Sequence, residues 1–138
     1  MFGQENINNE LSDKHTEVKG TKISIILPNG FSKATTFLGF QNEKKGATIN
    51  VMEMPAPFSE ISKGFSKEAL AQKGVEVQEI KKMIINNTSA VLITGEQKAY
   101  GNIYSKYVLV LGHDKESVII NCAFLKQFNE MSNAIKVV

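Results

Sequence analysis

The stretch from Thr48 to Gly74 constrains the fold most, because its hydrophobic pattern changes period partway through. Residues 47–54 alternate as a strand does, and neither face is purely polar, which is typical of a strand covered on both sides. Pro55 and Pro57 then end the strand, since proline has no backbone N–H to donate to a neighbouring strand. A helical pattern begins directly afterwards. This joint predicts a sheet and a helix that fold together.

The helical pattern covers residues 58–73 and gives one apolar face. The apolar positions, which recur every three or four residues, are Phe58, Ile61, Phe65 and Ala69. Gly64 interrupts the pattern, and Ser66 can begin a second helix as its N-cap. We therefore expect two short helices with the break at Gly64.

Most of the remaining chain reads as strands separated by turns. The predicted strands are 22–27, 36–41, 75–85, 89–100, 103–111 and 116–125. Tight turns at Asn86-Asn87, Gly101-Asn102 and 112–115 make the last four an antiparallel meander. The last strands are apolar on both faces, so other elements must pack on each face of the sheet and shield it from water. Residues 126–138 carry apolar side chains at helical spacing and are predicted to form a helix that packs on the second face.

The predicted fold class is α+β. It is an antiparallel sheet of about six to seven strands covered by helices on both faces, an α/β/α sandwich. Residues 1–20 are polar and are predicted to be a flexible tail with a short helical turn at 9–14, and residues 21–138 are predicted to form a single domain. Met1-Phe2-Gly3-Gln4-Glu5 resembles the end of a bacterial secretory signal peptide, which predicts an exported, periplasmic protein. The alternative is a cytoplasmic protein whose native start is a frayed tail.

Composition excludes several classes of function. The net charge is only +2, and all 16 basic residues are lysine, which argues against nucleic-acid binding. The single cysteine, Cys122, lies in an apolar run and reads as a buried hydrophobic residue. No apolar run is long enough for a transmembrane helix.

Motifs for catalysis, metals and cofactors are missing from the sequence. The two histidines, His15 and His113, lack partners at metal-ligand spacing, and His113-Asp114 reads as a turn. No nucleophile motif or phosphate-binding loop occurs. We therefore predict no catalytic residue, no metal site and no cofactor.

The remaining candidates for ligand or partner contact are apolar or aromatic. Met52, Met54, Tyr100 and Tyr104 are selected because methionine and tyrosine adapt well to ligands and partners. Tyr100 and Tyr104, on either side of a predicted turn, are the best of this set. Ordinary packing in the core and at its rim is the competing interpretation.

The order of elements resembles the Mog1/PsbP-like family, which includes small exported bacterial proteins. The resemblance covers about residues 20–138 and is carried by ISIILPNGF, by GATINVMEMPAPFSEISKGFSKEALAQKG, by the meander and by the predicted closing helix. It implies an α/β/α sandwich and a binding or assembly role without catalysis. One branch of the family binds a small GTPase and another is a subunit of photosystem II, but no partner-binding motif of either branch occurs here.

Three functions follow as hypotheses. The leading one is a non-enzymatic binding or assembly module of the bacterial cell envelope, with an unknown protein or small-ligand partner. The second is a small-ligand carrier with an apolar pocket between the sheet and the helix of 58–73. The third is an enzyme that uses Glu53 or Glu96 together with His113.

Overall fold

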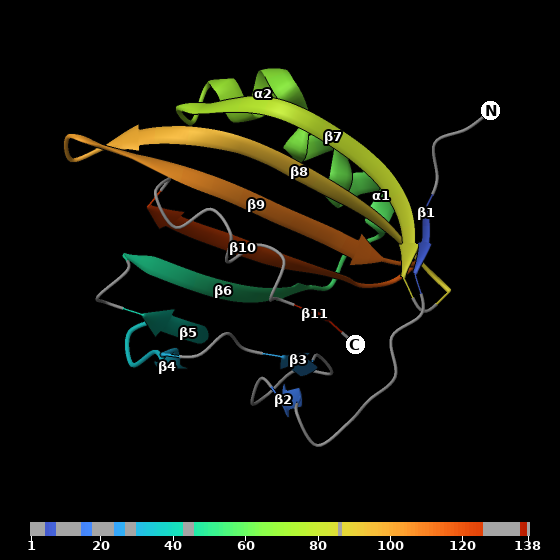
Figure 1. Ribbon diagram of the computed structural model, residues 1–138. Helices are drawn as coiled ribbons and strands as arrows, with labels where there is room; N and C mark the ends of the chain where they lie inside the picture. Colours follow the sequence, from blue (N-terminus) through green and yellow to red (C-terminus); the bar gives the residue numbers. More distant parts are fainter. Residues whose placement is uncertain are drawn as a thin grey trace.

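A computed structural model describes residues 5–7, 15–17, 24–26, 30–42, 46–85, 87–125 and 136–137 of the 138-residue chain. A large twisted sheet dominates the molecule (Figure 1). Its strands are β1 (Glu5–Ile7), β4 (Ser32–Lys33), β5 (Gly39–Asn42), β6 (Ala47–Met54), β7 (Val75–Ile85), β8 (Thr88–Ala99), β9 (Asn102–Gly112) and β10 (Ser117–Leu125). They lie side by side in the order β1-β7-β8-β9-β10-β6-β5-β4.

The seven strands from β7 to β4 are antiparallel to their neighbours, and the short β1 runs parallel to β7. The predicted meander is confirmed, because β7, β8, β9 and β10 pair consecutively with bounds close to those expected. The strand predicted at 47–54 is confirmed as β6. The strand predicted at 36–41 is found as β5, which begins later.

Two short helices and a 3₁₀ turn connect β6 to β7. They are α1 (Phe58–Ile61), η2 (Ser62–Phe65) and α2 (Lys67–Ala71). The prediction of two helices is confirmed, and Ser66 is the N-cap of α2, since its hydroxyl accepts a hydrogen bond of 3.2 Å from the Ala69 N–H. Gly64 lies inside the 3₁₀ turn, so the chain tightens there before the second helix begins.

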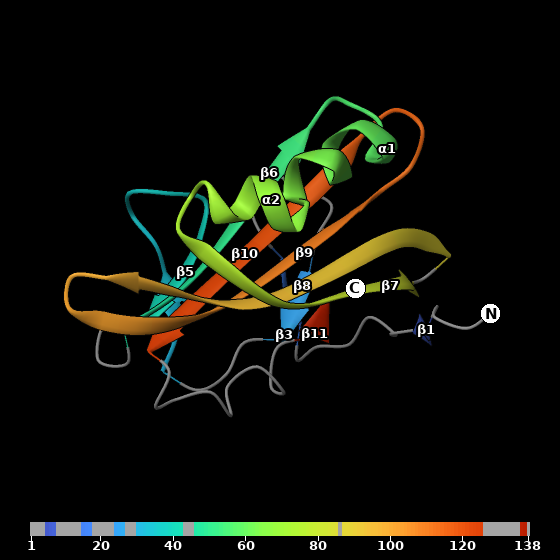
Figure 2. The same ribbon diagram turned by 90° about the horizontal axis from the view of Figure 1, so that it is seen from above.

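All helices among the described residues lie on the same side of the large sheet (Figures 1 and 2). A small sheet lies on the other side, with the strands β2 (His15–Glu17), β3 (Ser24–Ile26) and β11 (Lys136–Val137) in the order β11-β3-β2. Helices on both faces are therefore not found among these residues.

The helix predicted at 126–138 is wrong at its end, because Lys136–Val137 is a strand paired with β3. Its apolar spacing suited a helix, but pairing with a distant strand cannot be read from local spacing. Residues 126–135 lie outside the described part of the chain. Two short strands, β1 and β2, occur within the segment predicted as a tail, and the turn predicted at 9–14 lies outside the described residues.

The sheet has an apolar core on each face, as the two-sided patterns of its strands predicted. On the helix side, helical residues pack on the middle of β8, β9 and β10; the buried members are Leu70, Val75, Val91, Ile93, Val108, Val110 and Ile119. The other face buries a second cluster, Phe40, Ile49, Val51, Met83, Ile85, Ala90, Leu111, Ile120 and Cys122. Burial on both faces is what holds the long strands of the meander in register.

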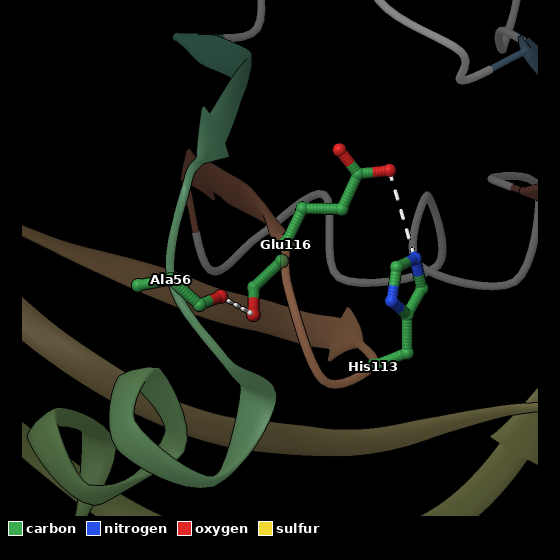
Figure 3. A network of polar contacts seen from close by, with 4 residues as sticks. Ala56, His113 and Glu116 are labelled. Carbon is green, nitrogen blue, oxygen red and sulfur yellow. Dashed lines mark hydrogen bonds and ion pairs between the residues drawn. The ribbon is translucent and has the colours of Figure 1, made fainter.

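The proline corner after β6 is fastened to the turn between β9 and β10. The buried Ser117 hydroxyl donates a 2.9 Å hydrogen bond to the Ala56 carbonyl. The His113 carbonyl accepts one of 2.9 Å from the first N–H of α1, that of Phe58. Figure 3 shows Ala56 and His113 at this joint. The corner therefore positions the helical segment over the sheet.

Candidate functional site

Tyr100 is the most exposed large hydrophobic side chain in the described part of the chain, at 96%. It lies with Gly101 at the tip of the β8–β9 hairpin, where Ala99 pairs with Asn102. Tyr100 and Gly101 have φ angles of 52° and 77°, as a two-residue type I′ turn requires. Glycine adopts this conformation freely, but a bulky residue such as tyrosine does so at a cost in free energy.

The other three contact candidates share the helix side of the large sheet, as the register of β6, β9 and β10 shows. Met54 packs against the apolar cluster under the helices, whereas Met52 is 46% exposed. Tyr104 is half-buried on β9.

The structure does not bring the four candidates into one site. Along β10, Met52 pairs with Ile119 and Tyr104 with Leu125, so the two lie about 20 Å apart along the strand direction. Tyr100 stands at the hairpin tip beyond Tyr104. The tip and the sheet face are thus separate candidate surfaces.

The residues of the enzyme hypothesis are also spread out. Glu96 pairs with Ser105, and Gly112, next to His113, lies at the other end of β9, about 24 Å along the strand. The exposed His113 ring instead lies 3.6 Å from the Glu116 carboxylate, within its own turn (Figure 3). Glu53 pairs with Val118, and its side chain is exposed. This arrangement fits a surface turn better than a shared catalytic centre.

The space between the helices and the sheet, predicted as a pocket in the carrier hypothesis, is occupied by side chains. Phe58, Ile61 and Phe65 pack against the buried cluster that contains Val110, which is fully buried. The Gln97 side chain also donates a 3.2 Å hydrogen bond to the Lys73 carbonyl, tying the end of the helical segment to β8. This interface is a packed core.

Cys122 is buried on the face away from the helices, as its apolar surroundings predicted. Burial raises the pKa of its thiol to about 12, although the nearby Lys106 opposes the shift. A thiol with this pKa is protonated at neutral pH and does not act as a nucleophile. Among the described residues, no group of three or more histidine, cysteine or acidic side chains could hold a metal ion.

Sequence reasoning missed two polar residues on the helix-side face, Lys106 and Asn121. Both alternate with apolar residues in strands whose neighbouring positions on that face are buried, such as Val108 and Ile119. A polar residue that interrupts a buried stripe is the signal that could have marked them. The strongly apolar composition of both strands on their two faces masks this interruption.

No protein-family model matches the chain, and no curated protein matches it in sequence. Its structure is similar to LpqN of Mycobacterium tuberculosis, which is involved in cell envelope biogenesis, with a TM-score of 0.59 and 10% identity over 87% of each chain. It is also similar to the cyanobacterial PsbP (CyanoP) of Synechocystis sp. PCC 6803, with a TM-score of 0.56 and 10% identity over 84% of this chain and 86% of that one.

At this level of identity the likeness concerns the fold, and the resemblance to the Mog1/PsbP-like fold is thereby confirmed. None of the helices in the described part of the chain is long and apolar enough to cross a membrane.

Proposed function

We propose, from the Mog1/PsbP-like fold of this chain, that it is a binding or assembly module of the bacterial cell envelope and acts by contact without catalysis. The similar structure of LpqN, a protein involved in cell envelope biogenesis, supports the location.

The observation that carries the proposal is the geometry of Tyr100. Its side chain is 96% exposed, and its backbone is held in a conformation that tyrosine adopts at a cost. An exposed tyrosine gains little from packing in its own fold, but it offers a partner a large rigid surface and a hydroxyl. A hairpin tip that retains such a residue in place of the favoured asparagine fits a contact site.

The scattered acidic residues and His113 favour contact over catalysis. Glu96 and His113 lie near opposite ends of the sheet, and His113 contributes its carbonyl to the joint with α1. The filled space beneath the helices likewise favours an external binding surface over an internal carrier pocket.

Site-specific photocrosslinking tests the proposal. A benzoylphenylalanine in place of Tyr100 should capture a distinct partner in intact cells of the source organism, and the product should fractionate with the envelope. The matched control places the same probe at Lys115, which is exposed in the turn at the opposite end of β9. If both probes give the same products, or if the product is cytoplasmic, the proposal fails.

A further inference from the structure

The helices leave part of their own side of the sheet uncovered. Figure 2 shows them crossing the sheet while the end of β10 and the start of β6 stay free of helix. The register places five residues there in adjacent positions: Thr48, Ala123 and Lys106 in one row across β6, β10 and β9, and Asn50 and Asn121 in the next row. We call these five residues the open strip.

Asn121 brings an unmet hydrogen bond to the open strip. Its side-chain oxygen Oδ1 is buried and has no hydrogen-bond partner among the residues that the structure describes. Buried carbonyl oxygens in folded proteins nearly always have a donor, so an oxygen without one is a position where a ligand can gain affinity. The ligand must supply an N–H or O–H group at this point.

Lys106 brings a positive charge to the open strip. Its cross-strand neighbours on the same face are Gly95 and Ala123. The β7 backbone at Glu76 and Val77 packs onto Gly95, so the room beside Lys106 lies on the side of the small Ala123. Lys106 is half-buried and has no ion pair within the described part of the chain, and burial lowers the pKa of its ammonium group. Buried lysines are usually paired with an anion, so this position suits a carboxylate from outside.

Lys106 and Asn121 are diagonal neighbours on adjacent strands, because Asn121 pairs with Val108, two residues beyond Lys106. Their Cα atoms are therefore about 7–8 Å apart. One small molecule that carries a carboxylate and a hydroxyl group a few bonds apart can span both residues, with the partly buried Asn121 side chain turning its oxygen toward the hydroxyl.

We propose that the open strip binds a sugar acid, with its carboxylate on Lys106 and a ring hydroxyl donating to Asn121. Thr48 and Asn50 are uncharged and can both donate and accept, as further sugar hydroxyls require. The strip spans about 10 Å by 7 Å, which suits one or two sugar rings. This inference rests on the proposed envelope function and names a ligand class for it.

The neighbouring Tyr104 strengthens the choice of a sugar over a peptide terminus. It lies two residues from Lys106 on the same strand and face, and it is half-buried. An aromatic ring can pack on the C–H face of a sugar ring while the hydroxyls point to polar neighbours. The strip itself lacks the deep apolar pocket that a peptide side chain would need, since Thr48 is exposed and its partner is Ala123.

Titration with glucuronate, followed by backbone amide NMR, tests the inference, with glucose and acetate as separate arms. Glucuronate should give saturable chemical-shift changes centred on Lys106, Asn121 and Ala123 at millimolar concentrations. Glucose, which lacks the carboxylate, and acetate, which lacks the hydroxyl groups, should each bind at least about tenfold more weakly. Absence of saturable shifts would overturn the inference, as would equal shifts with acetate, which would indicate simple attraction of anions to lysine.

Two variants locate the site. Lys106→Met and Asn121→Leu should each weaken glucuronate binding by about tenfold or more, while Lys115→Met, at an exposed turn, should bind as the wild type does. Amide spectra show whether each variant is folded, and Lys106→Met decides alone if Asn121→Leu does not fold. Wild-type affinity in folded Lys106→Met refutes the site. Crosslinking through Tyr100 is independent of this result, so the two proposals can fail separately.

Discussion

At the scale of single residues, Tyr100 combines high exposure with an unfavourable backbone conformation. Tyr100→Asn should stabilise the fold by about 1 kcal/mol, because asparagine before glycine is the favoured pair in a type I′ turn. Urea unfolding measures the change, and Tyr100→Phe is the control, since phenylalanine has the same backbone cost. Equal stability of the Asn and Phe variants would show that the turn stores no strain.

Cys122 should make the stability depend on pH above the ordinary thiol range. Burial raises the pKa of the folded thiol to about 12, so between the ordinary pKa and that value only the unfolded state loses the proton. The free energy of unfolding should therefore fall by up to about 1.4 kcal/mol per pH unit in this window. Lys106, whose pKa is lowered by burial, acts in the opposite direction.

The comparison with Cys122→Val isolates the thiol, because Lys106 is present in both proteins. Urea unfolding at a series of pH values should show the wild type losing stability relative to the variant above the ordinary thiol pKa. Parallel curves for the two proteins would contradict the assigned burial of Cys122.

At the scale of elements, the joint between β6 and α1 depends on a contact between residues far apart in the chain. Ser117→Ala should destabilise the protein by about 1–3 kcal/mol, because it leaves the Ala56 carbonyl without its donor. Hydrogen exchange at the Phe58 N–H, which is bound to the His113 carbonyl, should also become faster.

Ser89→Ala is the matched control for Ser117→Ala, since Ser89 is exposed on β8. It should change the stability by less than about 0.5 kcal/mol. Equal effects of the two substitutions would mean that the corner is not held by the Ser117 hydroxyl.

The elements that the sequence predicts well are those with a local signal. The meander was predictable because turn residues such as Gly101 separate strands with strong apolar patterns, although the β8–β9 turn is Tyr100-Gly101, one residue before the predicted Gly101-Asn102. The N-cap at Ser66 was predictable because capping is decided within one helical turn. The strand at 136–137 was not predictable, because it is specified by pairing with residues 25–26 at the other end of the chain.

At the scale of the whole molecule, the pattern of elements identified the fold although identity to similar structures is only 10%. Burial on both faces of the sheet can be satisfied by many apolar sequences, so the architecture persists where residue identities do not. The helix predicted on the second face of the sheet was wrong for the same reason. A strand with apolar residues on both faces requires packing on each face, but it does not specify whether a helix or a sheet provides it.

The candidate surfaces were predictable only in part. Tyr100 was selected from its place beside a turn, but its exposure and positive φ required the structure. Lys106 and Asn121 become neighbours only through the register of β9 and β10. Chemistry of single residues is visible in a sequence, whereas their juxtaposition across strands depends on pairing.

The most direct test of the central claim is the affinity of the Tyr100→Asn variant for the partner captured through Tyr100. A tyrosine at the centre of a contact contributes about 2 kcal/mol or more, so the variant should bind about 30-fold more weakly. Lys115→Met, with a change at the opposite end of β9, should bind as the wild type does. Unchanged affinity in the Tyr100→Asn variant would contradict a binding role for the hairpin tip.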